Sequence, residues 1–378
     1  MLNVQQYLQA KSLEDLTNEF AIKVAEHPTL PLVILNYNQI ESPKTATIVR
    51  ECRALVLDRR DWSVAAKSFN RFFNWGEVQE EQSQFDFSDF VVQSKEDGSL
   101  CVIYHFDGEW HANTRGSFAI DNMEFQNFTW RDAFCKALGI NSLKDLDGKL
   151  DKDLTYICEF CSPWNKIVRK YDQPQMYLLT VFNGMIEYWP ENVDEVAKAA
   201  GVFKRPTRYN FCNIDEIQAF LQEQASADAT FEGVVICDKQ GNRWKIKNLS
   251  YVSLHHLRGE GDNLYNPKHL LQFVLSGEDD ELMSYFPEAK ARFYEVKSKV
   301  LEAYCDLIET WGDHHDIVEQ KDFALTIKDN PFSSVLFDVR KKHGRNQLSL
   351  HVKQAFRENQ QLILKKLFKN ELVNTTIV

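Results

Sequence analysis

A lysine at the start of a tight turn is the residue of this chain best suited to chemistry. Residues 95–99 read Lys-Glu-Asp-Gly-Ser and follow, after Ser94, the strand-like run Phe-Val-Val-Gln at 90–93. A lysine amine in such a place can attack the α-phosphate of a nucleotide, expel pyrophosphate and hold the nucleotide covalently, which splits a difficult exchange into easier steps. The same string also fits a surface lysine beside an ordinary Asp-Gly hairpin turn. The turn alone therefore leaves both interpretations open.

Other charged residues inside strand-like runs favour the nucleophile. They are Glu159, Glu232, Lys245 and Lys247. Lys245 and Lys247 are two residues apart, so in a strand they share one face. Charge beside core strands is costly, and it is typical of functional sites. We therefore expect these four side chains to lie near Lys95.

The order of these residues resembles the ATP-dependent polynucleotide ligase superfamily, and the finer detail resembles the bacteriophage RNA ligases that repair tRNA. The resemblance covers about the first two-thirds of the chain. It rests on Glu51-Cys52-Arg53, on the runs 71–74, 95–100, 115–117, 159–160 and 232–233, on Asn165 before Ile167 and Val168, and on 245–247 leading to 251–255. Many motifs in one order carry more weight than any single short string.

The resemblance implies a role for each charged residue named above. Lys95 is the nucleophile that becomes adenylated, and Lys245 and Lys247 neutralise charge on the α-phosphate. Glu232 resembles the carboxylate that binds a divalent cation. Glu159 resembles a carboxylate that either reads the nucleotide sugar or helps to hold the metal, and the sequence leaves these two roles open.

Four more residues match nucleotide-binding positions of the family: Arg53, Arg71, Arg115 and Tyr251. The phage ligases carry lysine at the positions of Arg71 and Arg115, so the charge is kept and the geometry changes. Arg115 is supported by the Gly-Ser that follows it, whereas Arg71 also fits a surface residue beside a buried aromatic pair. Tyr251 also fits an ordinary core tyrosine.

The resemblance implies ATP as a cosubstrate, with AMP held on Lys95, and Mg²⁺ or alternatively Mn²⁺. It implies RNA with 5′-phosphate and 3′-hydroxyl ends as substrate, with broken tRNA as the expected source and a kinase or phosphatase that heals the ends as a partner. The alternatives are a DNA ligase, a capping guanylyltransferase and an inactive RNA-binding protein of the same fold. DNA ligases and capping enzymes usually continue into an OB-fold barrel, and this chain continues with helical periodicity.

Composition limits how the chain can bind nucleic acid. The 378 residues contain 44 Lys and Arg against 55 Asp and Glu, a net charge of −11, so binding must be local. Residues 335–372 carry an excess of lysine and arginine, which fits either an RNA-binding patch or a solvated helix surface. Eight scattered cysteines fit a reducing compartment. No apolar run is long enough to cross a bilayer, so we expect a cytoplasmic protein, working in the host cytoplasm if a phage encodes it.

The pattern predicts an α+β domain of antiparallel sheets with flanking helices at 1–258 and an all-α domain at 259–378. Strands are expected at 32–35, 54–57, 90–93, 101–106, 110–114, 155–160, 177–182, 234–237 and 243–246. Helices are expected at 123–138, from 213, from 266, and along two apolar faces further on. Residues 258–263 are the expected hinge.

Overall fold

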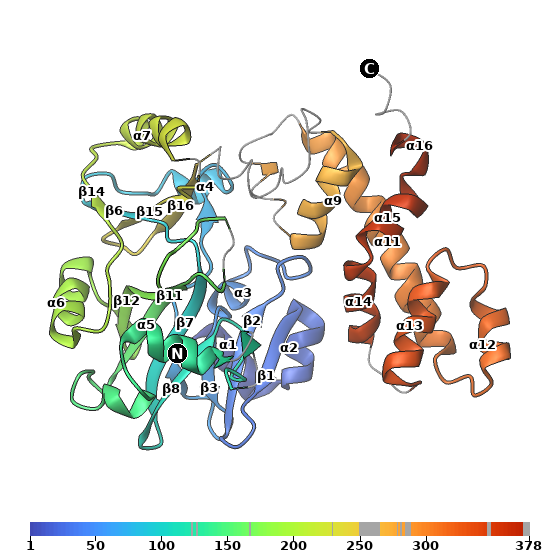
Figure 1. Cartoon of the computed structure of the whole chain (residues 1–378), viewed down its shortest axis with the longest axis horizontal. Coiled ribbons are helices and arrows are strands. Elements are labelled where there is room, and N and C mark those ends of the chain that lie inside the picture. The colour runs from blue at the N-terminus through green and yellow to red at the C-terminus, as the bar shows by residue number, and fades with distance from the viewer. Residues whose placement is uncertain are drawn as a thin grey trace. The chain divides into compact units, whose positions relative to one another are not determined.

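The computed structural model describes residues 1–121, 124–125, 128–165, 168–228, 230–248, 265–277, 279, 282–283, 289–345 and 349–372. Its contacts divide the chain into two compact units, Met1–His255 and His256–Val378 (Figure 1). The boundary expected between 258 and 259, and the expected hinge, lie outside the described residues.

Three sheets form the body of the first unit. The first has the order β1 (Ile22–Glu26), β2 (Leu32–Tyr37), β3 (Leu55–Asp58), β4 (Val64–Ala66). The second has the order β13 (Ile186–Glu187), β12 (Gln175–Asn183), β11 (Leu154–Cys161), β7 (Ser99–Phe106), β8 (Glu109–Thr114). The third has the order β14 (Arg208–Tyr209), β6 (Phe90–Ser94), β15 (Gly233–Asp238), β16 (Arg243–Lys247), β5 (Phe73–Asn74). Apart from the parallel pair of β16 and β5, these neighbours are antiparallel.

The strands predicted from apolar runs are confirmed, with small shifts at their ends. The helix predicted at 123–138 begins too early. Residues Glu124–Phe125 and Phe128–Thr129 pair as the ribbon β9–β10, and α5 is Trp130–Leu138. Thr129 caps this helix by accepting a hydrogen bond from the Asp132 amide, and a capping side chain of this kind fixes where a helix starts.

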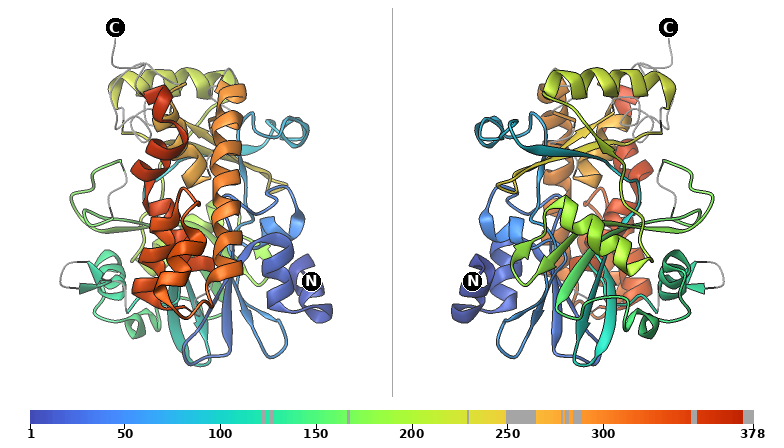
Figure 2. Two further views of the ribbon diagram at one scale, coloured as in Figure 1. Left: turned by 90° about the vertical axis from the view of Figure 1, so that its right-hand side faces the viewer. Right: turned by 90° about the vertical axis from the view of Figure 1, so that its left-hand side faces the viewer.

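Helices cover the outer faces of the sheets (Figures 1 and 2). They are α1 (Asn3–Ala10), α2 (Leu13–Phe20), α3 (Thr47–Glu51), α4 (Gln79–Gln82), α5, the 3₁₀ helix η1 (Leu143–Leu146), α6 (Pro190–Ala200) and α7 (Ile214–Ala227). α5 and α6 bury Phe134 and Val193 against the second sheet, and α7 buries Ile217 and Leu221 against the third. As predicted, α7 starts after Asn213, whose side chain accepts the Glu216 amide.

The second and third sheets are therefore each supported from behind. The first sheet adds to this support, because its residues Ile34 and Val56 share one core with Val102 and Tyr104 of β7. Burial of such side chains stabilises a fold by about 1.5–3 kcal/mol each. The ends of β6 and β7 that meet at Lys95 thus belong to sheets with well-packed cores.

The described part of the second unit is helical. Its helices are α9 (Pro267–Ser276), α11 (Lys290–His314), α12 (Gln320–Ile327), α13 (Ser333–His343), α14 (Ser349–Glu358), α15 (Gln360–Leu367) and α16 (Lys369–Leu372). The predicted apolar face of α11 is buried at Phe293, Val296, Val300, Leu307 and Trp311. The α+β class with a helical C-terminal region is confirmed. Among the described residues, no helix is long and apolar enough to span a membrane.

Candidate active site

The chain crosses from the third sheet to the second at Lys95. β6 ends at Ser94 and β7 begins at Ser99, so the turn 95–98 joins the two sheets. The Lys95 amide donates to the Gly233 carbonyl at 2.8 Å, which ties the turn to the start of β15. Two rigid sheets therefore fix the backbone of the candidate nucleophile.

The Lys95 side chain faces Glu232. Lys95 Nζ lies 2.6 Å from Glu232 Oε1, and Lys247 Nζ lies 3.8 Å from the same oxygen. Glu232 is 5% exposed, and burial raises its pKa although Lys95 and Lys247 oppose this rise. The third sheet thus brings one carboxylate and two of the predicted cations into one cluster.

Gly233 allows Glu232 to lie close to Lys247 on β16. It stands opposite Lys247 in the β15–β16 pair and has a φ of +139°. A Cβ at Gly233 would lie 2.7 Å from the Lys247 Cα and even nearer the Ile246 carbonyl oxygen. Glycine is therefore required for Glu232 to stand directly beside β16.

Glu159 approaches from the second sheet. It lies on β11 opposite Leu100, just beyond the turn that carries Lys95. Burial, together with the nearby Glu232 carboxylate, raises the pKa of Glu159 to about 7, although Lys95 and Arg53 lower it. The two predicted glutamates therefore flank the lysine from different sheets.

A cavity of about 90 Å³ opens between the two sheets at this point. Its walls include four of the predicted residues, Arg53, Lys95, Glu159 and Lys245. Val235 and Leu179 add apolar surface from opposite sheets. A small, partly apolar cavity with converging charges is typical of a ligand site.

The three predicted arginines gather around Tyr37, at the end of β2. The Arg71 and Arg115 guanidinium groups lie 5.7 and 5.8 Å from its ring centre. Burial alone would raise the pKa of the Tyr37 hydroxyl, but the charges of Arg53, Arg115 and Arg71 lower it. Sequence reasoning missed Tyr37, since a tyrosine ending an apolar strand gives no signal of its own.

Arg53 and Arg71 are both well enclosed. The Arg53 guanidinium lies between Phe69 and Phe72, 4.6 and 4.8 Å from their ring centres, and burial lowers its pKa to about 10. Arg71 is 7% exposed and pairs with Glu77 at 3.1 Å. The interpretation of Arg71 as a surface residue is therefore wrong.

A larger cavity of about 640 Å³ shares Phe69, Phe72 and Arg243 with the smaller one. Its cations and their partners are Lys67 with Ser68 and Asn70, Arg50 with Glu81, Arg71 with Glu77, Lys239 with Asp89, and Arg243 with Glu187. Because carboxylates or neutral oxygens already contact these cations, we assign no anionic ligand to it.

A divalent cation fits the cluster of Lys95, Lys247 and Glu232. Glu232 Oε2 is buried and has no hydrogen-bond partner among the described residues. Those residues contain no group of three or more His, Cys, Asp or Glu arranged to hold a metal. Mg²⁺ needs few protein carboxylates, because it keeps several waters and binds substrate phosphates.

Tyr251 lies outside the described residues.

The raised pKa of Glu159 predicts a pH dependence of stability. In the unfolded chain the carboxyl loses its proton near 4.5, and in the folded chain near 7. Its contribution to stability is full below pH 4.5 and is lost as the pH rises through 7, a loss on the order of 2–3 kcal/mol.

Urea unfolding of the protein and of Glu159→Gln at pH 5 and pH 8, without nucleotide or metal, checks this. Between the two pH values the wild type should lose more unfolding free energy than the variant, by about 2 kcal/mol. Equal losses in the two proteins would show that Glu159 ionises in the fold at its ordinary pKa.

Known proteins resemble this chain in the region of the site. A family model described as RNA ligase matches residues 51–252, more than half of the chain. An Autographa californica nuclear polyhedrosis virus protein named for a bifunctional polynucleotide kinase and RNA ligase is 29% identical over 365 residues, covering 90% of this chain and 50% of that protein. The RNA ligase of Rhodothermus phage RM378 is 22% identical over 363 residues, covering 81% and 80%.

Among solved structures, an archaeal ATP-dependent RNA ligase aligns with a TM-score of 0.45 and 13% identity, over 81% of this chain and 83% of that one. The chain spans half the length of the baculovirus relative.

Proposed function

Because the chain belongs to the RNA ligase family, we propose that it seals RNA in an ATP-dependent reaction that begins at Lys95. The observation that carries the proposal is the 2.6 Å contact between Lys95 Nζ and Glu232 Oε1, at the edge of a cavity shared by two sheets. An amine with a carboxylate at hydrogen-bonding distance to accept its proton, beside a cavity between two sheets, is an arrangement that suits covalent nucleotidyl transfer.

In the first step the Lys95 amine attacks the α-phosphorus of ATP. A P–N bond forms, the P–O bond to the β-phosphate breaks, and pyrophosphate leaves. Glu232 Oε1 is near enough to take the proton that the amine releases. Lys245 and Lys247 neutralise the negative charge that develops on the phosphate oxygens.

The next two steps reuse the same cations. AMP passes from Lys95 to an RNA 5′-phosphate, and an RNA 3′-hydroxyl then displaces AMP and seals the strand. Each step is an attack at phosphorus, so each needs positive charge at the same place.

The remaining residues bind ATP in this proposal. Glu159 lies at the cavity wall, where it can contact the ribose or a metal. Arg53 and Arg115, beside Tyr37, bind the phosphates, and arginine suits this role because its planar group donates two parallel hydrogen bonds. Arg71, which pairs with Glu77, keeps the nucleotide-binding role that its position in the family motif implies by adding positive charge beside Tyr37. Tyr251 keeps the nucleotide-binding role that its position in the family motif implies.

A divalent cation, Mg²⁺ or alternatively Mn²⁺, would supply further charge neutralisation at the phosphates. Glu232 Oε2, for which the described part of the chain offers no hydrogen-bond partner, and the Glu159 carboxylate would hold it, together with water and phosphate oxygens.

The proposed substrate is RNA with a 5′-phosphate and a 3′-hydroxyl, with broken tRNA as the source. A relative named for both a kinase and a ligase supports a partner that prepares 5′-phosphate ends. We assign the adenylyl transfer to residues 1–258, and residues 259–378 form a separate helical domain in this proposal. We place the reaction in the cytoplasm, which is the host cytoplasm if a phage encodes the protein.

The test is incubation of the purified chain with Mg²⁺ and nucleotide labelled at the α-phosphate, followed by denaturing electrophoresis. Pyrophosphate treatment first removes any bound AMP. A label from ATP, and sealing of a tRNA broken in its anticodon loop, support the proposal. A label from GTP alone indicates a guanylyltransferase, sealing of nicked DNA alone a DNA ligase, and no label at all a binding protein.

A further inference from the structure

The turn that carries Lys95 is held by buried hydrogen bonds to Tyr171. The Asp97 amide donates to the Tyr171 hydroxyl at 3.1 Å, and that hydroxyl donates to Glu96 Oε2 at 3.2 Å. Ser94 Oγ donates to Glu96 Oε1 at 2.6 Å. Ser94, Glu96, Asp97 and Tyr171 are each less than 10% exposed. One phenol therefore bonds two residues of the nucleophile turn, Glu96 and Asp97, and through Glu96 it is linked to Ser94 before the turn.

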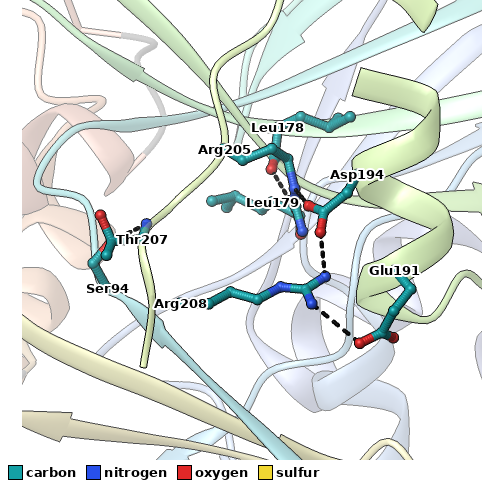
Figure 3. Close-up of polar contacts among 8 residues, drawn as sticks. All are labelled: Ser94, Leu178, Leu179, Glu191, Asp194, Arg205, Thr207 and Arg208. Carbon is teal, nitrogen blue, oxygen red and sulfur yellow. Dashed lines mark hydrogen bonds and ion pairs between the residues drawn. The ribbon is translucent and has the colours of Figure 1, made fainter. Parts of the chain in front are cut away.

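Each end of this chain of hydrogen bonds has its own anchor. Asp97 Oδ2 accepts the amides of Val168 and Arg169 at 2.9 and 2.7 Å. At the other end, Ser94 Oγ accepts the Thr207 amide at 2.9 Å (Figure 3). Because both ends are fixed to neighbouring segments, the hydrogen bonds of Tyr171 complete a continuous chain that holds the turn with Lys95 in place.

The segment that holds Ser94 is itself fastened to the second sheet. Figure 3 shows Arg205 donating to the Leu178 and Leu179 carbonyls and pairing with Asp194, which also pairs with Arg208. Thr207 lies between these two arginines in the chain. Contacts with β12 and α6 thus fix the position of the segment that holds Ser94, and through Ser94 the position of Glu96.

We propose that Tyr171 is a positioning residue for the first step, and that its hydroxyl keeps the Lys95 amine in line with the α-phosphate. The proposal rests on the proposed adenylation of Lys95. Without the hydroxyl, the Asp97 amide and one Glu96 oxygen lose a buried partner, and the turn relaxes until both find another. A displacement near 1 Å can slow a positioned reaction by about a hundredfold.

The hydroxyl is suited to this fixed role. Burial raises the pKa of Tyr171 far above its ordinary value, so the group stays protonated and keeps donating to Glu96. Sequence reasoning gave no sign of it, because Tyr171 lies in an irregular segment 74 residues away from Asp97.

The test separates positioning of Lys95 from general support of the fold. Tyr171→Phe removes one oxygen atom, and Ser94→Ala breaks the same chain of hydrogen bonds from its other end. The control is Tyr156→Phe, since the Tyr156 hydroxyl is also buried and also accepts one amide and donates to one oxygen, both of Asp151. Two rates are measured for each: formation of the protein–AMP bond from labelled ATP, and sealing of RNA that already carries AMP on its 5′-phosphate.

Both test variants should form the protein–AMP bond about tenfold more slowly, with sealing of the adenylylated RNA within about twofold of wild type. The Tyr156→Phe protein should match wild type in both. An equal fall in both rates, or no fall in either, overturns the positioning role. Wild-type protein that takes no label would instead overturn the proposed function, so the two failures are distinct.

Discussion

Replacing Lys95 with alanine should abolish the covalent protein–AMP product while leaving the protein folded. The attacking atom is Lys95 Nζ; of its neighbours in the cluster, Glu232 carries no amine, and Lys247 is the cation that neutralises the phosphate. The rate of labelling by ATP should fall by a factor on the order of 10⁴ or more. Denaturing electrophoresis after incubation with α-labelled ATP measures it.

Lys95→Arg is the matched control for charge. It keeps a cation close to the buried Glu232, which in the alanine variant loses its nearer ion pair and retains the one with Lys247 at 3.8 Å. Both variants should lose the label, yet both should still seal RNA that already carries AMP, because Nζ forms no bond in that step. A label that persists on Lys95→Ala would assign the nucleophile to another residue, which peptide mapping would then identify.

The sequence predicted those parts of the site that stand on regular strands. Lys245 and Lys247 share a face because strand side chains alternate, and Glu159 was noticed because it interrupts an apolar run. The strands themselves follow from the same alternation. These features depend on neighbours in the chain, so the chain alone reveals them.

The rest of the site depends on contacts between distant segments. Tyr37 gains its meaning from three arginines on other elements, and Tyr171 from a turn far earlier in the chain. The start of α5 was missed for a related reason, since a cap at Thr129 outweighs a longer helical pattern. The burial of Arg71 likewise follows from the packing around Phe73 and Glu77.

Gly98→Ala should impair both the fold and the first step, although Gly98 itself carries no reactive group. A Cβ at this position would lie 2.8 Å from Cys161 Sγ and even nearer the Phe160 carbonyl oxygen, a backbone atom of β11. The added methyl group would clash with the backbone of β11, which cannot move away easily because it is paired with strands on both sides. Overpacking of this kind costs about 1–3 kcal/mol.

The turn would then move away from β11 and carry Lys95 with it, so the rate of protein–AMP formation should fall by about a hundredfold. Urea unfolding and labelling by ATP measure the two effects. Gly312→Ala is the control, because a Cβ on that residue of α11 meets nothing within 4 Å. If Gly98→Ala matched the control in both measurements, the turn could shift without loss of stability or activity. The close packing of the turn against β11 would then not determine the reactivity of Lys95.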